Sequence, residues 1–143
     1  MKVMALDLGT KTVGVALSDP SGFLASPLVT LRFASDDYDD ALTQVEALLN
    51  KHPVDTVVLG FPKNMDGTVG LSGQRSLFFK EEMELFTSIP VVLWDERLTT
   101  VAAHKILIAN DKRRSERKEV VDQLAAVQML QEYLDHTRLK EKK

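Results

Sequence analysis

Short apolar runs separated by turn-forming residues make up the first thirty positions of the chain. Runs at 2–8 and 12–18 are joined by a tight turn that contains Gly9, and a third run at 23–31 follows a Pro- and Gly-containing turn at 19–22. Apolar runs of this length, bounded by Gly and Pro, are typical of β-strands. Because the connections are short, we expect the three strands to form an antiparallel meander.

Beyond position 37 the apolar residues recur at the helical period, interrupted by two short β-branched runs. This spacing predicts strands at 56–60 and 91–94, and helices at 38–51, 71–87, 99–109 and 115–136. Strands separated by helices pair in parallel through right-handed crossovers. The sequence therefore predicts an α/β fold with a mixed, five-stranded central sheet flanked by helices, as one domain over 1–138 with a charged tail at 139–143.

The helical spacing also predicts which side chains face the core. In the helix at 38–51, the acidic residues at 36–40 are expected to cap the N-terminus rather than bind metal. The core-facing positions of the three best-defined helices are predicted to be Leu42, Val45, Leu48 and Leu49 in the first, Leu77, Phe78, Met83 (or Phe79), Leu85 and Phe86 in the second, and Val120, Val121, Leu124, Val127, Leu130 and Leu134 in the last.

The composition limits the possible functions. No apolar run approaches the roughly 20 residues needed to cross a bilayer, and the N-terminus has no signal-peptide pattern. The chain has no cysteine, which excludes disulfides, thiol catalysis and cysteine metal sites and fits a cytoplasmic location. The three histidines have no zinc-like spacing, and the net charge of −3 gives no overall indication of nucleic-acid binding.

Several carboxylates fall where the predicted fold can bring them together. Asp7 ends the first strand, Asp95 and Glu96 end the last, and Asp122 flanks the apolar positions of the last helix. Ligands of such sheets bind beyond the carboxyl ends of the parallel strands. Converging carboxylates repel one another unless a cation such as Mg²⁺ or Mn²⁺ neutralises them, and two such ions can promote phosphodiester hydrolysis. Two alternatives remain open: Asp7 could accept hydrogen bonds from N–H groups of the turn, and Asp122 could face the solvent.

A basic stretch comes just before Asp122 in the sequence. Residues 111–118 contain five basic side chains against two acidic ones. Such side chains can hold a nucleic-acid backbone by salt-dependent contacts, although a solvated basic loop is the alternative. The Gly-rich loop at 61–70 ends where a helix begins, so it is either a phosphate-positioning loop or an ordinary connection. The candidate phosphate-binding residues are Lys11, Lys112, Arg113, Arg114, Arg117 and Lys118.

Four motifs, in order along the chain, resemble those of the YqgF family. The family commonly has Leu where this chain has Phe61, but the match covers nearly the whole chain, and four ordered motifs are far more specific than one. The motifs are Asp7-Leu8-Gly9-Thr10-Lys11 with Gly14-Val15-Ala16 and Ser18-Asp19, then Gly60-Phe61-Pro62 with Met65-Asp66-Gly67 and Gly70, then Asp95-Glu96-Arg97-Leu98-Thr99-Thr100, and finally Asp122 with Ala125 and Ala126.

Members of that family are described as Holliday junction resolvases and as nucleases of pre-16S ribosomal RNA. The resemblance implies a ribonuclease H-like fold, a catalytic and metal-binding set of Asp7, Glu96 and Asp122, and Mg²⁺ or Mn²⁺ as cofactor. It also implies a cytoplasmic nuclease that processes the 5′ end of the 16S RNA precursor, with branched DNA as the alternative substrate and ribosome-assembly factors as further partners. The expected supporting residues are Gly9, Asn64, Gly67, Asp95 and Arg97.

Two other function classes share features with this sequence. Actin-like and sugar-kinase-like ATPases have a similar start to Asp7-Leu8-Gly9-Thr10, but they need two such domains, and the chain has no second copy of the motif. A non-catalytic module could instead use the fold and the basic loop to hold ribosomal RNA or an assembly factor. A junction resolvase usually works as a two-fold dimer, and the sequence leaves monomer and homodimer open.

Overall fold

The structure is a computed structural model of the 143-residue chain. It describes the backbone over 1–64, 66–95 and 114–141, and the side chains over the first two of these ranges and over 123–138. The predicted helix at 99–109 lies outside the described residues. Five strands are present in these ranges: β1 (Val3–Leu8), β2 (Thr12–Ser18), β3 (Ala25–Arg32), β4 (Thr56–Phe61) and β5 (Val91–Asp95).

The strands form one mixed sheet in the order β3-β2-β1-β4-β5, so β1 is the central strand. β2 pairs antiparallel with β1 and β3, whereas β4 pairs parallel with β1 and β5. This confirms the predicted meander followed by parallel strands. β3 begins two residues later than predicted, because the N–H groups of Phe23 and Leu24 donate to Asp19 Oδ1 at 2.8 and 3.0 Å and keep both residues in the turn.

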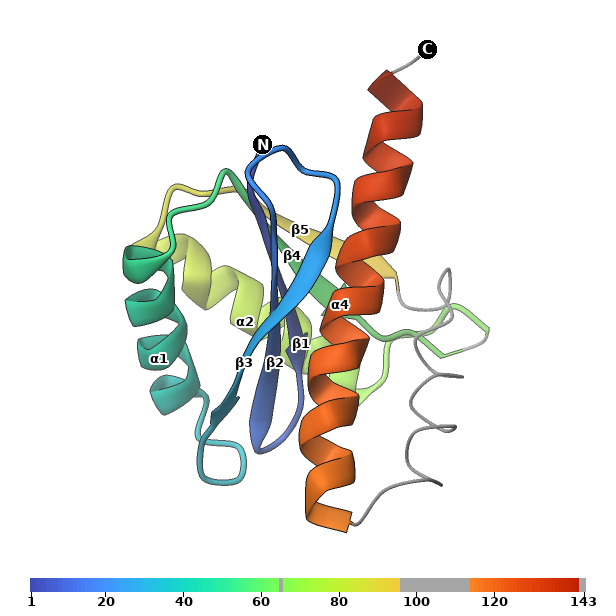
Figure 1. Cartoon of the computed structure of the whole chain (residues 1–143). Helices are drawn as coiled ribbons and strands as arrows, with labels where there is room; N and C mark the ends of the chain where they lie inside the picture. Colours follow the sequence, from blue (N-terminus) through green and yellow to red (C-terminus); the bar gives the residue numbers. More distant parts are fainter. Residues whose placement is uncertain (65, 96–113, 142–143) are drawn as a thin grey trace.

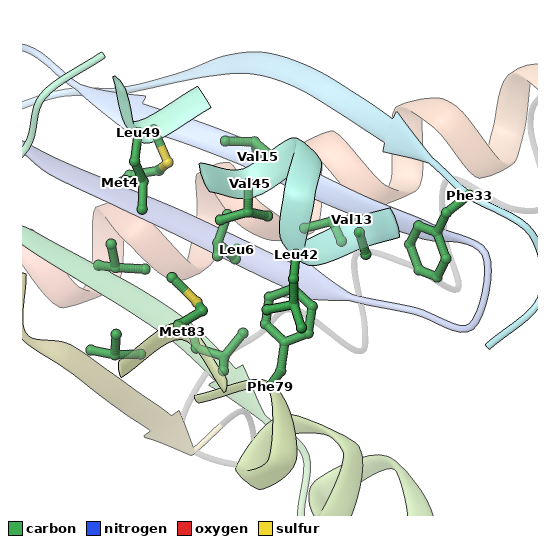
Figure 2. Close-up of a cluster of buried hydrophobic side chains, with 14 residues drawn as sticks. Met4, Leu6, Val13, Val15, Phe33, Leu42, Val45, Leu49, Phe79 and Met83 are labelled. Carbon is green, nitrogen blue, oxygen red and sulfur yellow. The ribbon is translucent and has the colours of Figure 1, made fainter. Parts of the chain in front are cut away.

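Helices cover both faces of the sheet (Figure 1). α1 (Tyr38–Lys51) and α2 (Leu71–Phe86) pack on one face, and α4 (Arg114–Glu141) packs on the other. Side chains alternate along a strand, so β1 sends Met4 and Leu6 to the first face and Val3 and Ala5 to the second. Figure 2 shows the first of these two cores, in which the side chains of β1 and β2 meet those of α1 and α2. No described helix is long and apolar enough to cross a membrane.

The first helix agrees with its predicted pattern. Leu42, Val45 and Leu49 are buried, and Leu48 packs against them. Asp37 is the N-cap residue, and its carboxylate accepts a hydrogen bond from the N–H of Asp40 at 3.2 Å. The predicted capping role of the acidic cluster is therefore confirmed at Asp37.

The predicted core face of α2 is wrong in part, although Met83 and Phe86 pack in the core as predicted. Phe79 and Met83 are fully buried, but Leu77, Phe78 and Leu85 are exposed. The reason lies in the first turn of the helix, where a Cβ added at Gly73 would lie 2.8 Å from the carbonyl oxygen of Pro62 and 2.6 Å from Val69 Cγ1. The start of the helix therefore packs closely, through this glycine, against the end of β4 and the loop that follows it. A search for apolar spacing does not detect this contact.

The predicted core face of α4 is confirmed at three of its four described positions: Leu130 and Leu134 are buried, and Val127 packs against the same cluster. The side chains of Val120 and Val121 lie outside the described residues. Leu124 is exposed instead, and Ala125 and Ala126 take inner positions. Small alanines let the helix approach the sheet, where they pack with Val3, Ala5, Ala16 and Val58. α4 also continues to Glu141, five residues beyond its predicted end.

Candidate active site

Asp7 is a buried carboxylate at the carboxyl end of the central strand. Only 7% of its surface is exposed. It follows Val3 and Ala5 at two-residue intervals, and both of those side chains pack against α4, so Asp7 faces the α4 side of the sheet. The sequence predicted this strand-end position. An ionised carboxylate is costly to bury unless polar or cationic groups accompany it, which makes this point of the sheet the best candidate for chemistry.

Glycines flank Asp7 on both neighbouring strands. Gly14 of β2 lies directly opposite Asp7, and the register of Leu6 with Leu59 brings Gly60 of β4 beside it. Neither glycine has a side chain, so β2 and β4 project no side chain over the carboxylate on the α4 side. Sequence reasoning assigned no role to either glycine. The available signal was strand alternation, since each takes the α4-facing position of its strand.

The turn after β1 is held by backbone and phenol hydrogen bonds. The Gly9 N–H donates to the carbonyl of Thr12 at 2.8 Å, and the hydroxyl of Tyr38 donates to the carbonyl of Gly9 at 3.3 Å. Burial raises the pKa of Tyr38 above its ordinary value of 10.0, against the opposing effect of Arg75, so the phenol keeps its proton. Lys11 is exposed in this turn, at the same end of the sheet as Asp7.

Helix α4 is fastened to the opposite end of the sheet by one amide side chain. Gln131 accepts a hydrogen bond from the N–H of Ala25 at 3.0 Å and donates one to the carbonyl of Phe23 at 2.8 Å. Ala25 pairs with Ser18 across β2 and β3, and the Ser18 hydroxyl accepts from the N–H of Val3 at 2.8 Å. Gln131 is therefore level with the start of β1.

This alignment fixes where the backbone of position 122 lies along the sheet. Four residues of strand separate Val3 from Asp7, a span of about 13 Å. Nine residues of helix separate Gln131 from Asp122, a span of about 14 Å in the same direction. Figure 1 shows α4 beginning beside the end of the sheet at which β1 ends. Position 122 is thus near the level of Asp7, one helical turn before the two buried alanines of α4.

The side chain of Asp122 and the whole of Glu96 lie outside the described residues. Among the side chains that are described, no three carboxylates or imidazoles gather as a metal site would require. Only Asp7 of the predicted catalytic set has a described side chain. Glu96 follows directly on Asp95, the last residue of β5.

Asp95 is not brought together with Asp7. Along β5, Leu93 packs with the α1 and α2 core, whereas Trp94 packs with the α4 core. Alternation therefore turns Asp95 to the face opposite Asp7. Trp94 lies opposite Gly60 and meets the ring of Tyr133 edge to face, with centroids 5.7 Å apart.

The loop after β4 is closed by its own residues. The Asn64 N–H donates to the Thr68 carbonyl, and the Gly67 N–H donates to the Asn64 carbonyl, both at 2.9 Å. The Asn64 amide also donates to the Thr68 hydroxyl at 2.8 Å. Gly67 has φ +89°, a conformation that favours glycine. Lys63 lies over the Phe61 ring at 5.4 Å, an interaction available to this chain because it has Phe at that position.

The basic residues of the predicted substrate surface are described only in part. Arg114, Arg117 and Lys118 lie in the first two turns of α4, whose backbone is described there. This end of α4 is the one beside the carboxyl end of β1 (Figure 1). Lys112, Arg113 and Arg97 lie outside the described residues.

Solved structures share this arrangement of sheet and helices. The chain superimposes on Thermus thermophilus RuvC in complex with a Holliday junction substrate with a TM-score of 0.63, covering 98% of this chain and 96% of that one at 12% identity. The fowlpox virus resolvase in complex with junction DNA gives a TM-score of 0.53 at 11% identity, covering 96% and 99% of the two chains. The fold is therefore the ribonuclease H-like fold of the junction resolvases.

Sequence comparison gives the family. Residues 1–136 match the family described as "RuvX: Holliday junction resolvase". A Bacillus subtilis protein named "Putative pre-16S rRNA nuclease" is 50% identical over 135 residues, which cover 94% of this chain and 98% of the relative. A protein of the same name from Halalkalibacterium halodurans is 45% identical over 140 residues, 98% of this chain and 100% of the relative. The chain belongs to the RuvX family of nucleases, also called YqgF.

Proposed function

We propose that this protein is a metal-dependent endonuclease that hydrolyses phosphodiester bonds at the 5′ end of the 16S ribosomal RNA precursor. The observation that carries the proposal is Asp7, a buried carboxylate with glycine on both neighbouring strands. A carboxylate at this position, with no side chain on the neighbouring strands to cover it, is well placed to offer an oxygen ligand to a divalent cation. Membership of a nuclease family over 1–136 supplies the reaction class.

The proposed catalytic and metal-binding set is Asp7, Glu96 and Asp122. A donor set made of carboxylates alone suits Mg²⁺ or Mn²⁺, which prefer hard oxygen ligands. When bound, such ions supply activation of the attacking water and stabilisation of the leaving oxygen. The alignment of α4 through Gln131, which brings the backbone of position 122 near the level of Asp7, supports the inclusion of Asp122.

The remaining predicted residues have binding or supporting roles in this proposal. Basic side chains at both flanks of the site would contact phosphates, which predicts binding that weakens steeply with salt. Asn64 and Gly67 would keep the loop after β4 closed, and Gly9 would keep the turn after β1 tight. Asp95 would act from the other face of the sheet as a positioning residue for the segment that contains Glu96 and Arg97. The phosphate-binding set comprises Lys11, Lys112, Arg113, Arg114, Arg117 and Lys118.

The names of the relatives favour RNA as the substrate, and ribosomal RNA processing would take place in the cytoplasm in one nuclease domain over 1–138. The family description favours a second candidate function, resolution of branched DNA. The two differ in what they require, because symmetrical cutting of a junction needs two active sites related by a two-fold axis.

A cleavage assay separates these functions. Purified protein is incubated with a 5′-extended 16S precursor fragment, a generic single-stranded RNA and a four-way DNA junction, each with Mg²⁺, Mn²⁺ or EDTA. The variant Asp7→Asn removes the charge at nearly constant size. Asp39→Asn is the matched control, since Asp39 is an exposed carboxylate in the first turn of α1.

We expect metal-dependent cutting of the precursor fragment that is lost in Asp7→Asn and unchanged in Asp39→Asn. Preference for the junction would move the assignment to the resolvase. Absence of cutting with every substrate and metal, together with RNA affinity that does not depend on Asp7, would reject the nuclease in favour of a binding module.

A further inference from the structure

Three consecutive carbonyl groups of the turn after β1 accept hydrogen bonds from one neighbouring segment. The donors all belong to residues 33–38, which connect the end of β3 to the first turn of α1. The bonds run from the Tyr38 hydroxyl to the Gly9 carbonyl at 3.3 Å, from the Asp36 N–H to the Thr10 carbonyl at 2.8 Å, and from the Phe33 N–H to the Lys11 carbonyl at 3.0 Å. Residues 33–38 therefore fix the orientation of the peptide groups in this turn.

Two of these donors come from the side of the sheet that α1 and α2 cover. The Tyr38 ring packs against Phe79 of α2, with ring centroids 6.3 Å apart. Asp36 pairs with Arg75 of α2 at 3.8 Å. The carbonyl groups that Tyr38 and Asp36 bind are therefore turned toward α1 and α2, whereas Asp7 faces α4 on the other side of the sheet.

The N–H groups of Thr10 and Lys11 point the other way. A trans peptide directs its C=O and its N–H in opposite directions, and the described peptide bonds are all trans. The Thr10 N–H shares a peptide group with the Gly9 carbonyl, and the Lys11 N–H shares one with the Thr10 carbonyl. Both residues are exposed, and neither N–H donates a hydrogen bond to a described residue. Two neighbouring backbone donors thus face away from α1 and α2, toward the side on which Asp7 lies.

Asp36 has a left-handed backbone conformation, with φ +60°, which is uncommon for a residue other than glycine. Such a conformation persists where surrounding contacts hold it, and it occurs often at functional sites. The contacts here are the N–H bond to Thr10, the ion pair with Arg75 and the Tyr38 hydroxyl, which lies 3.4 Å from Asp36 Oδ1. The carboxylate of Asp36 is thereby directed toward α2 and away from the N–H groups of Thr10 and Lys11.

We propose that the N–H groups of Thr10 and Lys11 bind a phosphate of the RNA strand beside the bond that is cut, and that Tyr38 is the positioning residue that holds them in place. Neighbouring backbone N–H groups in a turn form an anion-binding concavity, and the exposed Lys11 side chain adds positive charge there. Thr10 lies three residues beyond Asp7, at most about 11 Å along the chain. The subsite therefore suits a phosphate next to the one that reacts. This inference rests on the proposed nuclease function for the identity of the bound strand.

The subsite is tested directly by ¹H–¹⁵N spectra of the full chain titrated with a short single-stranded RNA, first in EDTA and then in Ca²⁺. Hydrogen bonds to an anionic oxygen are strong, so we expect the amide protons of Thr10 and Lys11 to move to lower field. The Gly22 N–H is the internal control, because it already donates to the Asp19 carbonyl at 3.0 Å, at the opposite end of the sheet.

A second RNA, with uncharged methylphosphonate linkages, tests whether the phosphate charge is what these donors bind. This RNA should leave the signals of Thr10 and Lys11 in place. Unmoved signals with the ordinary RNA in both EDTA and Ca²⁺ would overturn the proposal. Equal shifts with the uncharged RNA would overturn it as well, because the contact would then not be to a charged phosphate.

The positioning role is tested by Tyr38→Phe, which removes one hydroxyl and keeps the ring that packs against Phe79. We expect RNA binding in EDTA, measured by fluorescence anisotropy, to weaken about three- to tenfold, the range that one hydrogen bond contributes. Under cleavage conditions KM should rise by the same factor, with kcat within about twofold of wild type.

Tyr133→Phe is the matched control, since Tyr133 is the other tyrosine of the chain and packs against Trp94. Circular dichroism verifies that both variants are folded. Unchanged RNA affinity in Tyr38→Phe, or equal weakening by the two variants, would contradict the positioning role.

The salt dependence of binding separates the backbone donors from the charge of Lys11. Tyr38→Phe removes no charge, so the slope of log affinity against log salt concentration should stay as in wild type. Lys11→Gln removes one charge and should reduce that slope by about 0.7, while the amide shifts of Thr10 and of residue 11 remain. If Tyr38→Phe reduced the slope as much as Lys11→Gln, the hydroxyl would act on the lysine side chain and the assignment to the backbone would be wrong.

None of the binding measurements requires cleavage. A protein that shows the amide shifts but cuts no substrate would keep the phosphate subsite and lose the proposed nuclease function. A protein that cuts RNA without these shifts would keep the function and lose the subsite.

Discussion

Asp7 and Gly14 lie opposite each other in the antiparallel pair of β1 and β2, on the face of the sheet that α4 covers. Residues directly opposite in such a pair have Cβ positions about 4.5–5.5 Å apart. A side chain at position 14 would therefore occupy the space in front of the carboxylate. In the proposed site, the glycine would keep this space free for the cation and a phosphate.

Gly14→Ala should reduce cleavage strongly while the protein remains folded. One methyl group at this position crowds the approach to Asp7, and a misplacement of about 1 Å is enough to cost on the order of 100-fold in rate. We expect a loss of at least about tenfold in turnover, measured by single-turnover cleavage, with a melting temperature within a few degrees of wild type. Full activity in Gly14→Ala would show that the open space has no role.

Gln131→Ala should weaken both stability and activity. The variant leaves the N–H of Ala25 and the carbonyl of Phe23 without their hydrogen bonds to the amide, a loss of about 1–3 kcal/mol. It also releases the attachment that aligns α4 with β1. We therefore expect turnover to fall by a larger factor than the affinity for RNA measured without Mg²⁺. Urea unfolding and cleavage measured on the same preparation check both effects. Unchanged turnover with reduced stability would mean that other contacts align the helix.

The buried face of α2 can be tested by measuring the free energy of unfolding of two variants. Phe79→Ala should destabilise the fold by about 3–5 kcal/mol, since Phe79 is fully buried. Leu85→Ala should change it by less than about 0.5 kcal/mol, because that side chain is 80% exposed. Unfolding in urea is followed for both variants under the same conditions. If both variants lowered the free energy of unfolding by similar amounts, α2 would have the orientation predicted from its apolar spacing and not the one in the structure.

The difference between the predicted and observed core faces of α2 shows which parts of the fold could be predicted from the sequence. The mixed sheet followed from the turns and the strand lengths, and the strand-end position of Asp7 followed from the apolar run before it. Leu77, Phe78 and Leu85 of α2 and Leu124 of α4 were wrongly assigned to the core. Small residues, Gly73 in α2 and Ala125 and Ala126 in α4, take inner positions of these helices instead. Small residues allow close contacts there, between α4 and the sheet and between α2 and the loop after β4. A search for large apolar side chains does not detect such contacts.

The site was predicted unevenly for a similar reason. Asp7 could be singled out as a candidate because it directly follows an apolar run that predicts a buried strand. Gly14 and Gly60 matter because they have no side chains beside Asp7. Their position next to Asp7 follows only from the pairing register of β1 with β2 and β4. The orientation of Asp95 away from Asp7 likewise depends on which face of β5 receives Trp94.

Asp19 makes part of the stability dependent on pH. Hydrogen bonds from the Leu24 N–H, the Ser21 hydroxyl and the Phe23 N–H lower the pKa of Asp19 from 3.8 to about 2. Because the pKa is lower in the folded state, the carboxylate contributes stability above pH 3.8, and this contribution is lost as the pH falls through about 2. The gap in urea midpoint between wild type and Asp19→Asn should therefore close over that interval. If the difference in urea midpoint stayed constant down to about pH 2, the hydrogen bonds to Asp19 would not be the cause of this pH dependence.

The most direct test of the central claim is Mn²⁺-induced broadening of backbone amide signals in ¹⁵N NMR spectra. The claim is that Asp7 helps to hold a divalent cation on the α4 side of the sheet. The account predicts that the signals of Asp7, Gly14 and Gly60 disappear first as Mn²⁺ is added, and that Asp7→Asn abolishes this effect. Broadening centred on the acidic residues 36–40, with Asp7 and its neighbours unaffected, would contradict the account.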